Sequence, residues 1–162
     1  MHRHGYKGRK FGRERDQRNA LMVGLARSLF VHGSIVTTVE KAKELRPMAE
    51  KIISKARKND LANRRAVIAA VHDIQVGNNL VDVIAPAIKR DSGYLRIVKL
   101  DENRVGDNAA KARIEFVDLD EVKKALERTK EVVIPSEAEE SSSKKAPAKK
   151  SAEPKADKKE DK

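Results

Sequence analysis

Basic side chains that suit a polyphosphate backbone are concentrated at the start of the chain. The first 18 residues hold five arginines and two lysines against two acidic residues, Glu14 and Asp16, which gives a net charge of +5. The planar guanidinium of arginine grips a phosphate through two hydrogen bonds, whereas lysine acts as a solvated point charge. Gly5, Gly8 and Gly12 interrupt this segment and no apolar periodicity runs through it, so we do not expect it to fold alone. A basic arm of this kind is typical of proteins that bind a nucleic-acid backbone.

Two aromatic residues, Tyr6 and Phe11, alternate with the cations of the arm, where their rings suit stacking on exposed bases. The chain has only two tyrosines, three phenylalanines and no tryptophan, so an aromatic platform spread over a sheet is not available. We assign Phe30 and Phe116 to the core. The arm is therefore expected to recognise backbone and shape more than base sequence.

Residues for catalysis or metal binding are sparse. The chain has no cysteine, which excludes disulfides and thiolate zinc sites. His2 and His4 lie two residues apart in the arm, while His32 and His72 stand alone in the sequence. No metalloprotease, serine-hydrolase or phosphate-loop motif occurs. We therefore predict no catalytic residues, no metal, no cofactor and no small-molecule substrate.

The hydropathy pattern predicts neither a membrane span nor a signal peptide. The apolar stretch Leu21–Val31 is interrupted by Arg27, and it is shorter than the roughly 18 residues that a span needs. No small-residue cleavage site follows it. We expect a cytoplasmic protein that does not bind a membrane.

The elements that must position the arm begin with a helix and a strand. Apolar residues at three- to four-residue spacing predict a helix from Asp16, its expected cap, to Gly33, its C-cap. The β-branched run Ser34–Thr38 predicts a short strand. Thr37 followed by Glu40 forms the pattern of a capping box at the start of the next helix.

That second helix is predicted to continue to Arg57, with a kink or a break at Pro47. A third helix is predicted over about 61–72, with Asn59 or Asp60 as the residue that starts it. A fourth is predicted over about 75–85 and ends before Pro86.

Two alternating segments, Tyr94–Leu100 and Ala112–Asp118, predict antiparallel strands joined by a loop. The sequence thus divides into a basic arm (1–15), a globular α+β domain (16–119), a C-terminal helix (120–133) and a tail. The tail (134–162) is rich in Lys, Glu, Ala, Ser and Pro, and this composition predicts disorder.

Six segments in consistent order resemble the bacterial-type large-subunit ribosomal protein number seventeen family. They are MHRHGYKGRKFGR at 1–13, IVTTVEKAKELRP at 35–47, NRR at 63–65, GYLRI at 93–97, RVGDNA at 104–109 and IEFVD at 114–118. The resemblance extends from Met1 to about Leu119 and assigns nothing to the tail.

The resemblance implies helices packed on a small mixed three-stranded sheet, in a protein that catalyses no reaction. It implies binding to large-subunit ribosomal RNA, contacts with neighbouring large-subunit ribosomal proteins, and a position near the mouth of the peptide exit tunnel. It places RNA-binding residues in the arm at Arg3, His4, Lys7, Arg9, Lys10, Arg13 and Arg18. It places others in the body at Lys41, Lys43, Arg46, Arg64, Arg65, Arg96 and Arg104.

Two other classes of function fit part of the sequence. A DNA-binding architectural protein also combines a basic body with a Lys/Ala/Pro tail, although the nearly balanced charge of this tail does not favour DNA. A small hydrolase or transferase on an α+β scaffold would need a polar pocket, which only the folded structure reveals.

Overall fold

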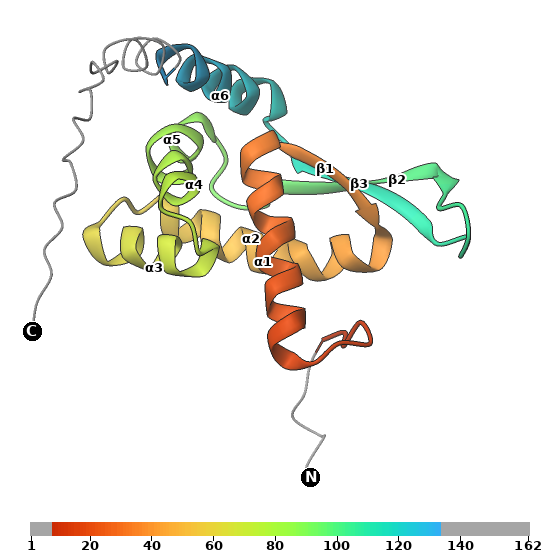
Figure 1. The fold of residues 1–162 in the computed structure, drawn as a ribbon. Helices are drawn as coiled ribbons and strands as arrows, with labels where there is room; N and C mark the ends of the chain where they lie inside the picture. Colours follow the sequence, from red (N-terminus) through yellow and green to blue (C-terminus); the bar gives the residue numbers. More distant parts are fainter. Residues whose placement is uncertain (1–7, 134–162) are drawn as a thin grey trace, which may run out of the picture.

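A three-stranded sheet and a set of helices share one core in the computed structural model, which describes residues 8–133 and the side chains of 8–128 (Figure 1). The start of the arm and the predicted disordered tail lie outside the described residues. The elements, in chain order, are α1 (Arg15–His32), β1 (Ser34–Thr38), α2 (Val39–Ala56), α3 (Leu61–Val71), α4 (Ile74–Asn79), the π-helix η1 (Leu80–Ile84), α5 (Ala85–Ala87), β2 (Leu95–Asn103), β3 (Ala110–Phe116) and α6 (Leu119–Val133).

Helix α1 ends where the sequence predicts but begins slightly earlier. Gly33 is the C-cap in the left-handed region, with φ at 74°, and its N–H donates to the Leu29 carbonyl at 2.8 Å. Glu14 occupies the N-cap position, so the prediction of Asp16 as cap was wrong. Asp16 lies instead in the first turn, where its negative charge interacts favourably with the positive end of the helix dipole.

Helix α2 is one continuous helix with Pro47 inside it, so the predicted break does not occur. Pro47 lies on the exposed side, where water can satisfy the carbonyl that loses its hydrogen bond. The buried residues on the other side hold the helix together by packing. The N-cap is Thr38 rather than Thr37, and no side chain caps the first turn, so the predicted capping box is absent.

The helical segment after α2 follows the prediction at its start and departs from it at its end. Asp60 caps α3 by accepting a hydrogen bond from the Asn63 N–H at 2.8 Å. The next segment continues past Pro86, which lies in α5 instead of ending the helix. The wider turn of η1 ends at Ile84, two residues before this proline, whose nitrogen cannot donate to the carbonyl four residues back.

The sheet has the strand order β1-β3-β2, and both pairs are antiparallel. The α+β class is confirmed, whereas the mixed sheet implied by the family resemblance is wrong. Strand β2 continues three residues beyond the predicted Leu100, with a register irregularity between Lys99 and Asn103. The β2–β3 hairpin therefore projects beyond the helices with a shorter loop than predicted (Figure 1).

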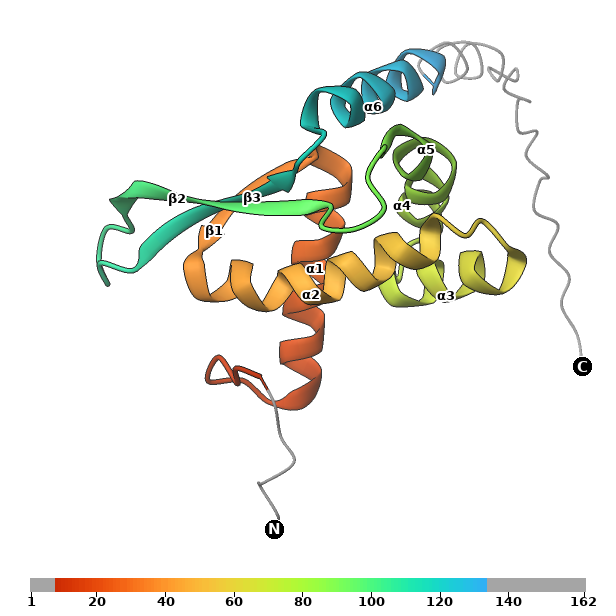
Figure 2. The same cartoon turned by 180° about the vertical axis from the view of Figure 1, so that it is seen from behind.

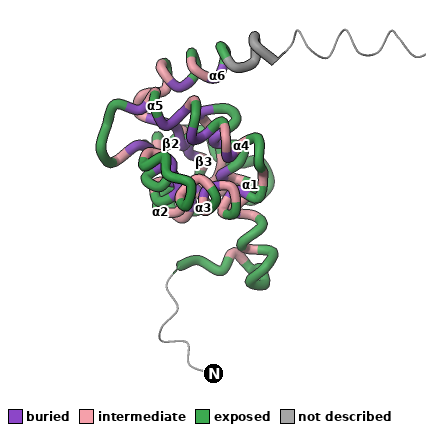
Figure 3. The backbone as a smooth tube through the Cα atoms, turned by 90° about the vertical axis from the view of Figure 1, so that its left-hand side faces the viewer, coloured by how far each residue is buried: buried purple, intermediate pink, exposed green. Residues whose placement is uncertain are grey.

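The core lies between the inner face of the sheet and the helices. Helix α2 runs beneath the sheet and packs against both β2 and β3 (Figure 2). Phe30 and Phe116 are 1% and 0% exposed, as predicted. Buried residues fill the centre of the molecule, whereas the segment before α1 is mostly exposed (Figure 3). The rigid core thus holds the start of α2 and the β2–β3 hairpin in fixed relative positions.

Two helical glycines should respond in opposite ways to alanine. A Cβ at Gly77 would lie 2.7 Å from Ile68 Cγ1 and 3.1 Å from Ile68 Cα, whereas a Cβ at Gly24 would meet nothing within 4 Å. We expect Gly77→Ala to destabilise the fold by roughly 1–3 kcal/mol through overpacking. Gly24→Ala should stabilise it by about 0.5–1 kcal/mol, because alanine has less backbone freedom to lose. Thermal unfolding of both variants tests this, and equal melting temperatures would contradict it.

Candidate nucleic-acid interface

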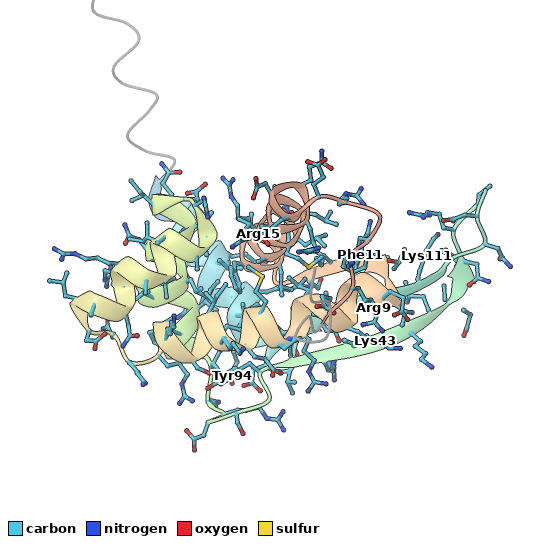
Figure 4. All side chains as sticks on the ribbon, turned by 90° about the horizontal axis from the view of Figure 1, so that it is seen from below. Arg9, Phe11, Arg15, Lys43, Tyr94 and Lys111 are labelled. Carbon is cyan, nitrogen blue, oxygen red and sulfur yellow. The ribbon has the colours of Figure 1, made fainter. Side chains whose placement is uncertain are left out.

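A groove of about 680 Å³ lies where the arm segment, the start of α2 and the β2–β3 hairpin meet. Among its described lining residues, six are basic and one is acidic: Arg13, Lys41, Lys43, Lys99, Arg104 and Lys111 against Glu40. These residues come from four separate parts of the sequence, and Figure 4 shows Phe11, Lys43 and Lys111 at the same end of the molecule. The groove is therefore a concentrated positive surface that only the fold assembles.

The acidic residue of this groove is itself neutralised. Arg9 forms an ion pair with Glu40 and approaches Glu44 at 3.5 Å, and Lys43 lies 3.4 Å from Glu40. Within the described residues, Arg13, Lys41 and Lys99 make no ion pair. Their charges are therefore available to an external anion.

The first turn of α2 adds a second source of positive potential. Thr38, Val39, Glu40 and Lys41 all line the groove. The Thr38 side chain makes no capping hydrogen bond, which leaves the N–H groups of the first turn without that acceptor. These N–H groups and the helix dipole favour a negatively charged group at this end.

The segment before α1 lies against α2 instead of extending freely. The Arg13 N–H donates to the Lys10 carbonyl at 3.1 Å and closes a turn, and Arg13 Nη1 donates to the Phe11 carbonyl at 3.0 Å. Arg9 links this turn to α2. Residues 8–14 of the predicted arm are thus already positioned beside the groove.

The structure places the predicted RNA-binding residues in several different settings. Arg3, His4 and Lys7 lie outside the described residues. Arg13, Lys41, Lys43 and Arg104 come together in the groove, next to the turn that carries Arg9 and Lys10. Arg18 is half-buried and lines a separate hollow between α1, α2 and α3.

The other predicted residues lie away from the groove, and three of them form ion pairs within the protein. Arg46 pairs with Glu50 at 3.1 Å on α2. Arg64 binds Asp82 on η1, and this contact raises the pKa of Arg64 and lowers that of Asp82. Arg96 lies 2.6 Å from Glu115, the buried carboxylate of β3. Arg65 is exposed on α3.

Sequence reasoning missed two groove residues, Lys99 and Lys111. Lys99 continues the face of β2 that carries Leu95 and Ile97, but it lies where the strand has passed beyond the buried core. Lys111 pairs with Thr38 across the sheet and lies 3.8 Å from Glu102. For Lys99, a lysine at the end of an alternating apolar series was the available signal, because such a position leaves the core while staying on the same face. Lys111 gave no such signal, because it is out of phase with the apolar residues Ala112 and Ile114.

Arg104 borders the groove, but its charge is matched by its own loop. Its Nε donates to Asp107 Oδ1 at 2.8 Å, and a terminal nitrogen contacts the other carboxylate oxygen. Asp107 also accepts a hydrogen bond from the Ala109 N–H at 3.3 Å. The Arg104 contact is the main cause that holds the pKa of the Asp107 carboxyl well below its ordinary value.

This ion pair predicts a measurable shift in titration. Because the pKa of Asp107 is lowered in the folded state, its stabilising contribution is present above the ordinary carboxyl pKa and is lost as pH falls through the folded value. In the Arg104→Ala variant we expect the midpoint to return toward the ordinary value of about 3.9. Carboxyl-carbon NMR titration of both proteins measures the two midpoints, and identical midpoints would contradict the pairing.

The described residues offer little for metal binding or membrane insertion. No group of three or more histidine or acidic side chains converges on a point within residues 8–128. None of the helices in the described part combines the length and the apolar character needed to cross a bilayer.

Comparison with known proteins identifies the family. The model of the family "Ribosomal protein L17" matches residues 21–117. A large ribosomal subunit protein bL17 of Mesorhizobium japonicum is 50% identical over 119 residues, covering 73% of this chain and 82% of the relative. One of Rhodopseudomonas palustris is 47% identical over 120 residues, covering 74% and 86%. One of Beijerinckia indica is 43% identical over 118 residues, covering 72% and 84%. The chain belongs to the ribosomal protein L17 family.

Proposed function

We propose that this chain is a structural constituent of the large ribosomal subunit that binds ribosomal RNA through its arm and the basic groove. Family membership supports the first part of the proposal. The observation that carries the second part is the convergence of six basic side chains on one groove, in which Glu40 is already paired with Arg9 and Lys43. Such a surface attracts phosphates and releases their counterions.

The groove suits RNA better than a small anionic substrate. Its cations are distributed along the arm, α2 and the hairpin rather than directed at one point. A chain of phosphates contacts such a surface at several places, whereas a single anion contacts only part of it. The RNA-binding set that we propose therefore consists of the arm cations other than Arg9, which pairs with α2, together with Lys41, Lys43, Lys99 and Lys111.

The pairing of three other arginines within the protein changes their proposed role. Arg64, Arg96 and Arg104 each bind a carboxylate of the folded chain. We propose that Arg96 acts chiefly in the fold, because its removal would leave the buried Glu115 carboxylate without a counter-charge.

Removal of residues 2–13 tests the role of the arm. This deletion keeps Glu14, the N-cap of α1, and its described part, residues 8–13, holds no residue of the hydrophobic core. We expect the truncated protein to unfold at nearly the same temperature as the full chain, but to be lost from large subunits during sedimentation of a cell lysate. Normal co-sedimentation of the truncated protein with large subunits would contradict the arm's role.

The proposal includes the position near the mouth of the peptide exit tunnel, which the family resemblance implies. A photo-crosslinker placed at exposed Val105, on the hairpin tip, would identify neighbouring molecules in intact subunits. Crosslinks to proteins or RNA far from the tunnel mouth would contradict that position.

A further inference from the structure

We infer that the basic groove binds an unstacked RNA nucleotide, with its base stacked on Phe11 and its flanking phosphates bound by the lysines that line the groove. The inference rests on the proposed function and adds the form of RNA that the site accepts.

The groove combines an apolar lining with a cationic one. Phe11, Val39, Leu100, Ala109 and Ala110 supply the apolar part. The six basic residues of the groove supply the cationic part. Duplex RNA presents phosphates and 2′-hydroxyl groups to a protein, and these polar groups do not stack on an aromatic ring. The base of an unstacked nucleotide has an apolar face that stacks on aromatic side chains, and the phosphates on either side of that nucleotide need cations.

The turn that presents Phe11 has an unfavourable backbone conformation. Phe11 and Gly12 have φ values of 53° and 60°, and the Arg13 N–H to Lys10 carbonyl hydrogen bond closes the turn around them. Positive φ at both central positions is the pattern of a type I′ turn, which favours asparagine, aspartate or glycine. A bulky aromatic residue in this conformation is strained, and such strain is retained where the surroundings hold it and often marks a functional position.

Arg9 links this turn to α2. Its guanidinium spans Glu40 and Glu44, which are one helical turn apart on α2. Arg9 and Phe11 lie close together beside Lys43 in Figure 4. We therefore assign Arg9 as a positioning residue for Phe11, in place of the phosphate contact that the family resemblance implies.

The test uses three RNA probes and the full-length chain. They are a single-stranded octamer of adenylate, an octamer of ribose-phosphate spacers without bases, and an eight-base-pair duplex. The octamer and the spacer strand carry the same phosphates, so their affinity ratio isolates the contribution of the bases. Fluorescence anisotropy should show the octamer bound about 5- to 100-fold more tightly than the spacer strand. Phe11→Ala should abolish this preference, Phe11→Trp should keep it, and Phe11→Leu should lose most of it.

Arg9 variants separate a positioning role from a phosphate contact. Arg9→Ala should reduce the preference for bases while leaving the slope of log affinity against log salt unchanged. Loss of a phosphate contact would lower that slope by about one. The double variant Glu40→Gln, Glu44→Gln makes the groove more positive, so it should bind the spacer strand more tightly and yet lose the preference for bases.

The outcomes distinguish this inference from the proposed function. Equal, salt-sensitive binding of all three probes would overturn the inference and leave RNA binding intact. Binding of none of them would count against RNA binding itself. Tighter binding of a polyglutamate peptide than of any RNA would replace the nucleotide with an acidic protein segment. Phe11 is not part of the hydrophobic core, so an unchanged melting temperature is expected for each Phe11 variant.

Discussion

Reversing three groove lysines together, Lys43→Glu, Lys99→Glu and Lys111→Glu, is expected to lower the affinity for ribosomal RNA by about 100-fold or more at moderate salt. The three side chains reach the groove from α2, β2 and β3. Each reversal removes one counter-charge and places a carboxylate where a phosphate would bind. The slope of log affinity against log salt should fall by roughly two to three.

A matched control separates RNA binding by the groove from RNA binding by the overall charge of the protein. Lys51, Lys58 and Lys124 are exposed and do not line the groove. Changing all three to glutamate gives the same net charge as the groove variant, and this control should keep most of the affinity for ribosomal RNA. Filter binding over a salt series measures both variants. A similar loss in the control would show that binding depends on overall charge, and the groove would lose its role.

Replacing Phe116 by alanine is expected to destabilise the fold by roughly 3–5 kcal/mol. Phe116 is 0% exposed at the end of β3, and it pairs with Leu95 of β2 across the sheet. Its removal leaves a cavity between the sheet and the helices that surrounding side chains fill only in part. Because a domain of this size has about 5–15 kcal/mol of total stability, a loss of this size is a large fraction of the whole. Urea unfolding measures the change.

The outer face of the same sheet provides the control for Phe116. Val98 is 43% exposed on β2 and takes no part in the core. Val98→Ala should change the free energy of unfolding by no more than about 0.5 kcal/mol. Equal losses for the two variants would mean that the core does not lie on the face of the sheet that carries Phe116.

Local patterns in the sequence were sufficient for most elements. The β-branched run at 34–38, the glycine at position 33 and the aspartate at position 60 act through neighbouring backbone groups, so their effects do not depend on the rest of the fold. Prolines were less informative. Pro47 and Pro86 both lie within helical segments, because packing of the surrounding residues outweighs the lost hydrogen bond.

The candidate site shows the same division between local and tertiary information. The sequence by itself determined the family resemblance, the basic arm and the cations at Arg13, Lys41 and Lys43, because these features depend on residue type and near spacing. Only the tertiary structure decided that Lys99 and Lys111 join them, and that Arg64 and Arg96 are paired within the protein. Partners 18 residues apart, as for Arg64 and Asp82, or 35 apart, as for Arg9 and Glu44, meet only after the chain has folded. Charge is a property of the sequence, but whether that charge is available to RNA depends on distances that the fold sets.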